Sequence, residues 1–351
     1  MLPPVLDSSA GKLLAPAVLL FFIPVTEILQ DLKETLIGYG QKETFDSLAR
    51  GLEYNFQNAE QNIALLTMLS YEQMVKAKKI TSPDYRLASI LAWCGEILNA
   101  GILICDDVLD RGQMRRSLPC WYTLENVGLN AVTDAFLLHQ FVFLTLTKHC
   151  RHLHCYTSLM ELFHEVCFRT ACGKSMDVAC TRKSVNEFNL RDYKTMAVNK
   201  ATFYNFYLPF ALSMHLAGFT DPKDLSQSLD ILAEIGLYFQ IQNDYMDCFG
   251  NMQTAGKIGT DIEDSKYSWL AITCMERANE QQKLIMMEDY GSKDPLRVQR
   301  VKDLYKALVL PSVFAAYEEK SYNDITDHIK QISSDVPPEI FLHILNKIYR
   351  R

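Results

Sequence analysis

The sequence predicts an all-α protein, and three observations support this prediction. Apolar residues recur at helical spacing over long stretches, as at Ile28, Leu32 and Leu36. The 15 Gly and 12 Pro lie mostly between these stretches, and no segment alternates apolar and polar residues as a half-buried strand does. Hydrophobic residues make up 48% of the 351 residues, which is enough for a large core.

The elements follow in order along the chain. Residues 1–30 are expected to form an N-terminal arm, because the apolar run at 13–25 contains two prolines and is too short to span a bilayer; a targeting sequence is the alternative. Residues 31–351 are expected to form one domain, because no Pro-, Gly- or Ser-rich linker divides them. The expected helices cover residues 26–37, 45–69, 86–109, 130–148, 158–177, 191–209 and 231–242, and several more follow.

Composition and charge exclude some classes of function. The net charge of −7 and the lack of a basic tract argue against a nucleic-acid partner. No segment predicts stable membrane insertion. The ten Cys show no CxxC spacing, which is typical of a reducing compartment. We therefore expect a cytoplasmic protein, with a mitochondrial location as the alternative.

The first acidic cluster stands at the end of the apolar helix expected over 86–109. If the helix continues, Asp106 and Asp110 are i,i+4 neighbours, and Asp107 and Asp110 are i,i+3 neighbours. Three carboxylates at the end of a buried helix repel one another unless a cation compensates them. Mg²⁺ suits this position, because it binds a few carboxylates together with substrate phosphates.

A second acidic cluster follows the apolar stretch at 231–242 and contains Asn243, Asp244 and Asp247. Two such clusters on facing helices could hold one polyphosphate through metal ions. The sequence therefore predicts a metal-dependent enzyme that acts on a diphosphate ester.

These motifs together resemble the trans-isoprenyl diphosphate synthases, and specifically the farnesyl diphosphate synthases of animals, over about residues 30 to 351. The motifs that carry the resemblance are Asp106-Asp107-x-x-Asp110, Arg115-Arg116, Lys200, Phe239-Gln240-Ile241-Gln242-x-Asp244-Tyr245-x-Asp247 and the run at 256–266. The resemblance implies the isoprenoid synthase fold, with about ten core helices around a deep central cavity. It also implies a homodimer and three Mg²⁺ ions, with Mn²⁺ as a substitute.

The resemblance assigns roles to individual positions, which are expectations at this point. The expected metal ligands are Asp106, Asp107, Asp110, Asn243, Asp244 and Asp247. The residues expected to act in catalysis are Asp106, Asp110, Lys200 and Asp244. The residues expected to bind the prenyl diphosphate are Arg115, Arg116, Lys200, Gln240, Lys257, Gly101, Ile102, Phe203 and Tyr204, where the two aromatic rings would face a carbocation.

The chain departs from the family where the second substrate, isopentenyl diphosphate, binds. The family has Gly-Gly-Lys-x-x-Arg-Gly after Glu-Tyr-Asn, whereas this chain has Glu60 at the Lys position and Ile63 at the Arg position. Two cations that hold a diphosphate have become an anion and an alkyl group, which should abolish useful binding.

Three smaller departures accompany this loss. Asn243 replaces an Asp, and Lys174 stands where the family usually has Gln, beside a retained Asp177. Gly101 and Ile102 replace the bulky aromatics that stop chain growth in animal farnesyl synthases, so we expect Gly101 to leave room for a longer allylic tail.

The expected function is that of the insect terpene synthases derived from this family. Such an enzyme ionises a prenyl diphosphate, here farnesyl diphosphate, and releases diphosphate with a sesquiterpene hydrocarbon or alcohol. One alternative is a divergent farnesyl or geranyl diphosphate synthase that condenses isopentenyl diphosphate with an allylic diphosphate. A non-catalytic helical subunit is the second alternative.

Overall fold

The computed structural model describes residues 15–250 and 259–349, with side chains from residue 25 onward. The chain divides into two compact units, each treated by itself below. The first unit comprises Met1–His164 and Leu208–Thr220, and the second comprises Glu165–Tyr207 and Asp221–Arg351.

The first unit is helical apart from one short hairpin. Its elements are α1 (Ala15–Gly38), α2 (Lys42–Phe56), α3 (Asn62–Ala77), α4 (Tyr85–Asp110), β1 (Met114–Arg115), β2 (Leu118–Pro119), η2 (Trp121–Thr123), α5 (Asn130–Cys150), the first part of α6 (Tyr156–Cys180) and α8 (Leu208–Leu216). The antiparallel pair β1–β2 forms the only sheet among residues 15–250 and 259–349. The prediction of an all-α protein is confirmed.

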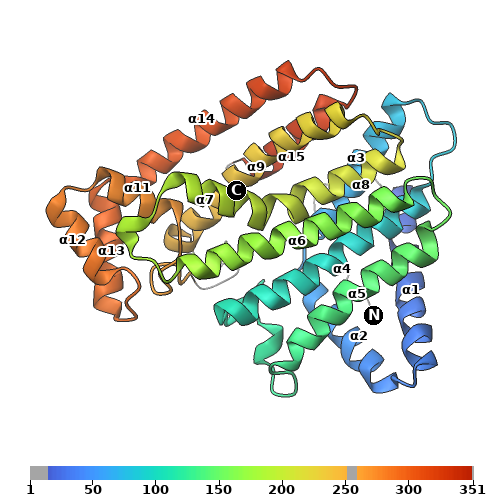
Figure 1. Ribbon diagram of the computed structural model, residues 1–351, viewed down its shortest axis with the longest axis horizontal. Helices are drawn as coiled ribbons and strands as arrows, with labels where there is room; N and C mark the ends of the chain where they lie inside the picture. Colours follow the sequence, from blue (N-terminus) through green and yellow to red (C-terminus); the bar gives the residue numbers. More distant parts are fainter. Residues whose placement is uncertain (1–14, 251–258, 350–351) are drawn as a thin grey trace. The chain divides into compact units, whose positions relative to one another are not determined.

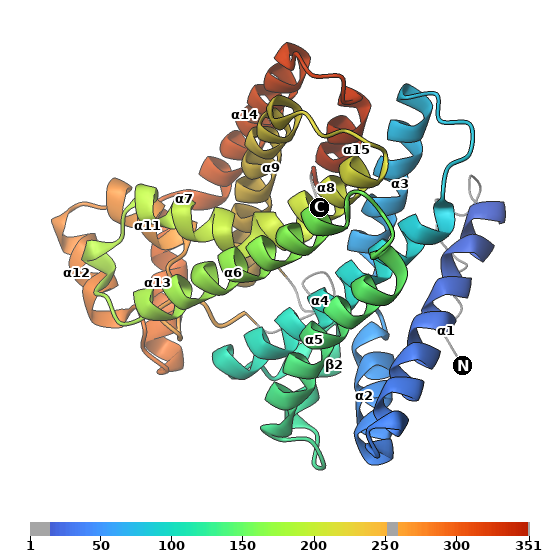
Figure 2. The same cartoon turned by 45° about the vertical axis from the view of Figure 1, so that its right-hand side comes forward.

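Helix α4 is the centre of the first unit. It packs against α1, α3, α5 and α8, and Figures 1 and 2 both show it lying beside α5. Within the described residues it is the one helix long and apolar enough to cross a membrane, but 83% of its most apolar stretch is buried in the protein. A helix that is apolar on all sides in this way belongs in a core. The helix predicted over 86–109 is thus confirmed.

The hairpin after α4 turns through two residues in the left-handed region. Arg111 ends α4 with φ +52°, and Arg116 and Ser117 in the turn have φ +52° and +64°. A two-residue turn with positive φ at both positions is the type I′ turn that matches the twist of paired strands. The hairpin thereby brings Arg115 back toward the end of α4.

The second unit consists of helices around α9. Its elements are the rest of α6, η3 (Val185–Glu187), α7 (Leu190–Ala197), the π-helix η4 (Val198–Tyr207), α9 (Pro222–Phe249), α11 (Trp269–Arg277), α12 (Glu280–Asp289), α13 (Pro295–Ala307), α14 (Leu310–Gln331) and α15 (Pro338–Ile348). Helix α9 contacts η4, α7, α11, α14 and α15 (Figures 1 and 2).

Three expected boundaries differ from the structure. Helix α1 begins at Ala15, inside the expected arm, and Pro16 falls in its first turn, where proline is tolerated. The helix expected over 45–69 is broken between α2 and α3, because Asn58 and Gln61 adopt left-handed conformations. The helix expected over 191–209 is divided into α7, η4 and α8. The expected arm at 1–30 and the single domain at 31–351 stay predictions.

Candidate active site

The first acidic cluster lies on the last turns of α4, as the spacing predicted. Asp107 is 5% exposed and accepts a hydrogen bond from Arg115 Nε at 3.0 Å. Arg115 Nη2 also lies 3.3 Å from Asp106 Oδ2. The β1–β2 hairpin therefore places a guanidinium group against two of the three carboxylates and compensates part of their mutual repulsion.

Asp106 and Asp110 fit a hard metal ion better than Asp107 does. Both are partly exposed and lie one turn apart on α4, whereas Asp107 is buried against Arg115. Among residues 15–250 and 259–349, no three His, Cys, Asp or Glu side chains are grouped closely enough to hold a metal alone. This arrangement suits Mg²⁺ only if substrate phosphate completes the coordination, which is how Mg²⁺ usually binds.

The end of α2 is tied to the hairpin through main-chain oxygens. Tyr54 donates to the carbonyl of Pro119 at 2.7 Å, and Arg116 Nη1 donates to the carbonyl of Asn55 at 2.6 Å. Asn58 Nδ2 in turn lies 3.2 Å from the carbonyl of Arg116. These bonds give the sequence Tyr54-Asn55 a structural role beside the first acidic cluster.

The segment that departs from the family exposes a carboxylate and buries an alkyl chain. Glu60 is exposed, and its Oε2 accepts from Asn62 Nδ2 at 2.9 Å. Ile63 is 2% exposed and packs on Gly95 of α4, where an added Cβ would lie 2.7 Å from Ile63 Cγ2. Ile63 is thus part of the core between α3 and α4.

Glu96 fixes the start of α3 from the neighbouring helix. Its carboxylate is 2% exposed and accepts from the amide of Ala64 at 3.0 Å. Burial raises the pKa of Glu96, and this effect exceeds the opposing effects of the Ala64 and Asn99 hydrogen bonds and of the Arg116 charge.

Gly101 lies against the backbone of α5. A Cβ at this position would lie 3.1 Å from the carbonyl oxygen of Ala135 and 3.6 Å from Leu138 Cβ. The missing side chain therefore lets α5 approach α4 closely, and α5 fills the space on that side of the glycine. The neighbouring Ile102 is partly buried. The expected effect of Gly101 on chain length stays a prediction.

In the second unit, Asp244 is held by three donors. Its Oδ2 accepts from the Tyr193 hydroxyl at 2.7 Å and from the Trp269 amide at 2.8 Å, and its Oδ1 accepts from Gln240 Nε2 at 2.9 Å. Burial raises the pKa of Asp244 despite these bonds. A metal ion at Asp244 would have to share oxygens that are already engaged.

The other two members of the second cluster are more accessible. Asn243 and Asp247 are partly buried, and Asp247 Oδ1 accepts from the Asp261 amide at 2.9 Å. The first and second clusters lie in different units, so the expected clamp between them stays a prediction.

Three lysines meet the buried carboxylate of Asp177. The Nζ atoms of Lys200, Lys266 and Lys174 lie 2.7, 3.2 and 3.5 Å from Asp177 Oδ2, and we call these three residues the lysine group. Burial alone would raise the pKa of Asp177, but the three positive charges outweigh it and hold the pKa well below its usual range. The three ammonium groups thus favour the ionised form of Asp177.

Helix η4 carries Lys200 and the two aromatic residues expected near the carbocation. Phe203 is 2% exposed, and the Arg169 guanidinium lies 4.6 Å from its ring centre. Tyr204 is partly buried. The role of these rings toward a carbocation stays a prediction, and Lys257 lies outside the described residues.

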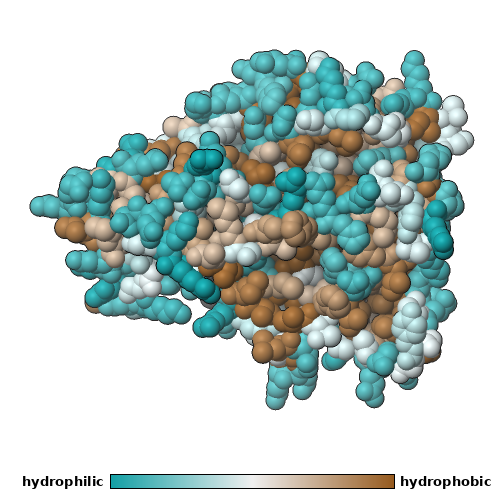
Figure 3. All heavy atoms as spheres, in the orientation of Figure 1, coloured by the Kyte–Doolittle hydropathy of each residue, from teal (hydrophilic) through white to brown (hydrophobic). Residues whose placement is uncertain are grey.

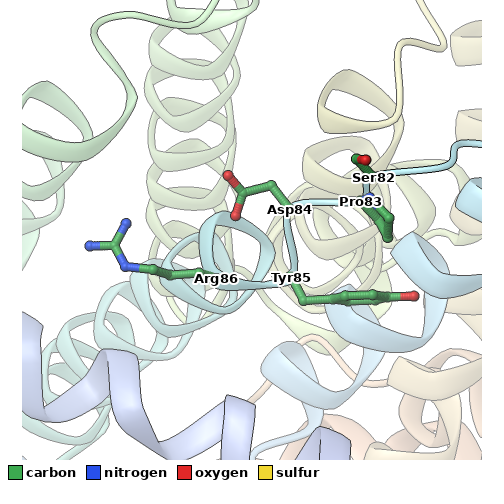
Figure 4. Close-up of a pocket in the computed structure, with 5 residues that line it drawn as sticks. All are labelled: Ser82, Pro83, Asp84, Tyr85 and Arg86. Carbon is green, nitrogen blue, oxygen red and sulfur yellow. The ribbon is translucent and has the colours of Figure 1, made fainter.

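One open pocket in the first unit lies far from the first acidic cluster. Residues 82–86 line it at the start of α4 (Figure 4). Asp84 caps the helix by accepting from the Leu87 amide, and Arg86 pairs with Glu27. The length of α4 separates this pocket from Asp106 by about 30 Å. Asp84 and Arg86 in this pocket have structural partners, and none of the five lining residues is among the residues predicted to bind metal or diphosphate.

The chain is similar to known proteins over most of its length. The polyprenyl synthetase family profile matches residues 46–308. The chain is 38% identical to the farnesyl pyrophosphate synthase of Rattus norvegicus over 330 residues, covering 93% of this chain and 94% of the relative. It is 37% identical to the farnesyl pyrophosphate synthase of Nezara viridula, covering 94% of this chain and 82% of the relative.

The chain belongs to the polyprenyl synthetase family. A solved structure of Trypanosoma brucei farnesyl diphosphate synthase, complexed with risedronate, is 25% identical and superposes with a TM-score of 0.86 over 95% of this chain and 99% of that one. The expected isoprenoid synthase fold is therefore confirmed. Enzymes of this family generally use Mg²⁺, and the carboxylates of α4 are consistent with such an ion.

The structure adds residues to the site of this family member that the spacing did not indicate. Tyr193 holds Asp244, yet nothing in its local sequence marks it. Lys174 and Asp177 stand together at the end of a predicted helix and Lys266 closes the motif at 256–266, but only the fold brings them to Lys200.

Proposed function

We propose that the protein ionises an allylic prenyl diphosphate. The C–O bond breaks, both electrons leave with the diphosphate oxygen, and an allylic carbocation remains. Bound Mg²⁺ would supply charge that stabilises the leaving diphosphate. Lys200 would donate a hydrogen bond to the leaving diphosphate, a role that the family resemblance implies for Arg115 as well.

The finer proposal is that this cation cyclises or rearranges without condensing with a second substrate. The observation that supports it is the segment after α2, which presents the Glu60 carboxylate and buries Ile63. A second diphosphate there would meet a negative charge instead of two cations. The product would be a sesquiterpene hydrocarbon or alcohol from farnesyl diphosphate, as in terpene synthases.

The second candidate is condensation of isopentenyl diphosphate with an allylic diphosphate. The comparisons taken alone favour it, because the relatives at 36–39% identity are named farnesyl pyrophosphate synthases. Arg116 also remains beside the segment after α2. Both candidates use the same ionisation, whereas a non-catalytic subunit would have no use for the acidic cluster on α4.

One assay separates the candidates. The unmodified protein is incubated with Mg²⁺ and farnesyl diphosphate alone, and separately with isopentenyl diphosphate plus dimethylallyl or geranyl diphosphate. We expect diphosphate and a terpene from the first mixture and no elongation in the second. Efficient elongation with intact farnesyl diphosphate would establish condensation, and no reaction in either mixture would favour the non-catalytic subunit.

We also propose a homodimer formed through α5. Leu129, just before the helix, and Val132, Phe136 and Leu144 on it are 74, 47, 63 and 49% exposed, and Figure 3 shows apolar surface over this helix. Exposed apolar side chains gathered on one helix are typical of a protein interface. The partner we propose is a second copy of the chain, because the family resemblance implies a homodimer.

For location we propose the cytoplasm, with a mitochondrial site as the alternative. All ten cysteines are free thiols, which supports a reducing compartment. A fluorescent fusion of the full chain would distinguish the two locations.

A further inference from the structure

Lys174 is the member of the lysine group that distinguishes this chain from the family it resembles. The resembled enzymes usually have Gln at this position, so the site gains a full positive charge here. The side chain is 12% exposed, and its Nζ lies 3.5 Å from Asp177 Oδ2, three residues further along α6. The ammonium group of Lys174 is therefore mostly buried and is directed toward the Asp177 carboxylate.

Glycine packing places Lys174 beside Lys200. A Cβ on Gly173 would lie 2.3 Å from the amide nitrogen of Lys200, so only glycine lets α6 and η4 approach this closely. Lys266 lies on a third segment, before α11. Its main-chain carbonyl accepts a hydrogen bond from the Tyr290 hydroxyl at 2.8 Å. All three ammonium groups are thus fixed within 3.5 Å of one oxygen.

Three ammonium groups on one carboxylate form a suitable receptor for a polyanion. Each ammonium carries three N–H donors, so each can hold Asp177 and further acceptors at the same time. Lysine binds phosphate as a compact point charge, and a diphosphate has enough oxygens to meet several such charges.

We propose that Lys174 binds the diphosphate group of the substrate and retains the inorganic diphosphate after the C–O bond breaks. The identity of the ligand rests on the proposed function, but both candidate reactions release this same product. The electron pair of the broken bond stays on the diphosphate oxygen, and Lys174 adds a hydrogen-bond donor and a positive charge where that negative charge collects.

The test is calorimetric titration of the full chain with inorganic diphosphate in the presence of Mg²⁺. Lys174→Gln restores the residue usual in the resembled enzymes, and we expect the Kd to rise by about 10- to 100-fold through loss of one charge-assisted hydrogen bond. Lys174→Arg keeps a positive charge that can donate to phosphate, so its Kd should rise clearly less than that of Lys174→Gln. Lys320→Gln is the matched control, because Lys320 is an exposed partner of Asp324 on α14, and its Kd should not change.

Two results would overturn the proposal. A Kd for Lys174→Gln that equals that of Lys320→Gln would mean that Lys174 only neutralises Asp177. Equal losses in the Gln and Arg variants would mean that geometry, not charge, is responsible, and a melting temperature of Lys174→Gln equal to that of the unmodified chain excludes misfolding as the cause of its loss. The titration needs no prenyl substrate, so tight diphosphate binding without turnover would count against the proposed function and not against Lys174.

Discussion

Asp106 and Asp107 are adjacent in sequence but have different surroundings. The side chain of Asp107 is buried against Arg115, whereas that of Asp106 is partly exposed and lies one turn from Asp110. Helical spacing could predict that the three carboxylates crowd one end of α4. It could not predict which of them is buried, because that depends on where the hairpin places Arg115.

Asp106→Ala should remove turnover without unfolding the protein. We expect activity to fall by about 100-fold or more, because an oxygen donor for the metal is lost, while Arg115 still holds Asp107. Asp84→Ala is the control, since it removes only the N-cap of α4 and should cost about 1 kcal/mol of stability with activity retained. Steady-state kinetics and thermal melts measure both, and near-normal Mg²⁺-dependent activity in Asp106→Ala would contradict the assignment.

Glu96 should make stability depend on pH. Its pKa is raised in the folded state, so above its ordinary value of about 4.5 the unfolded chain loses this proton first and stability falls as pH rises to the folded pKa. Glu96→Gln keeps an acceptor for the Ala64 amide and removes the charge. The free energy of unfolding of the variant, relative to the unmodified protein, should therefore increase between pH 4 and pH 7.5 in urea titrations. A difference independent of pH would show that folding does not shift the pKa of Glu96.

Gly101→Phe should disturb the packing of two helices. The first added carbon already meets Ala135 O at 3.1 Å, so overpacking should cost about 1–3 kcal/mol or displace the side chain toward the bound tail. If Gly101 sets substrate length, activity should fall far more with a 15-carbon than with a 10-carbon diphosphate. Equal losses with both substrates would mean that the residue only serves the contact between α4 and α5.

At the scale of elements, long apolar periodicity predicts where the helices lie. It does not predict breaks that depend on the backbone conformation of single residues. Helix α4 matches the expected 86–109 closely, because its burial on all sides leaves a continuous apolar run. The break between α2 and α3 was missed, because left-handed Asn58 and Gln61 carry no glycine to mark it. The division of 191–209 into α7, η4 and α8 has no sequence signal that we recognise.

The exposed face of α5 can be tested by changing its largest side chain. Phe136→Asp places a charge in the proposed interface, where desolvation would oppose association. We expect sedimentation analysis to show a dimer for the unmodified chain and a monomer for the variant. Leu296→Asp, which changes an even more exposed apolar residue on α13, should leave the dimer intact. An unmodified chain that sediments as a monomer would disprove the interface.

At the scale of the whole molecule, the sequence predicted the fold class and the acidic clusters but not the lysine group. Each acidic cluster lies within a few consecutive residues of one helix, so helical spacing is enough to predict it. The lysine group joins positions 174, 200 and 266 to Asp177, and such a meeting of distant segments is visible only after folding.

Metal removal should leave the protein folded. Arg115 already compensates part of the first cluster, and the three donors on Asp244 satisfy the second, so EDTA should change the melting temperature by no more than about 2 °C. Mg²⁺ with inorganic diphosphate should raise it, because ligands that bind only the folded state stabilise it. A large drop on adding EDTA would show that bound metal is part of the folded structure.

The bonds that join α2 to the hairpin bear on how this activity could have arisen. Arg116 donates to the main-chain carbonyl of Asn55 and Tyr54 donates to that of Pro119, so these two bonds beside the first cluster do not involve the side chains at 60 and 63. Substitutions there could remove a second substrate while Arg115 and the carboxylates of α4 kept their positions. Under the proposed function, loss of the second substrate would thus require changes in the segment after α2 and none in the hairpin that positions Arg115.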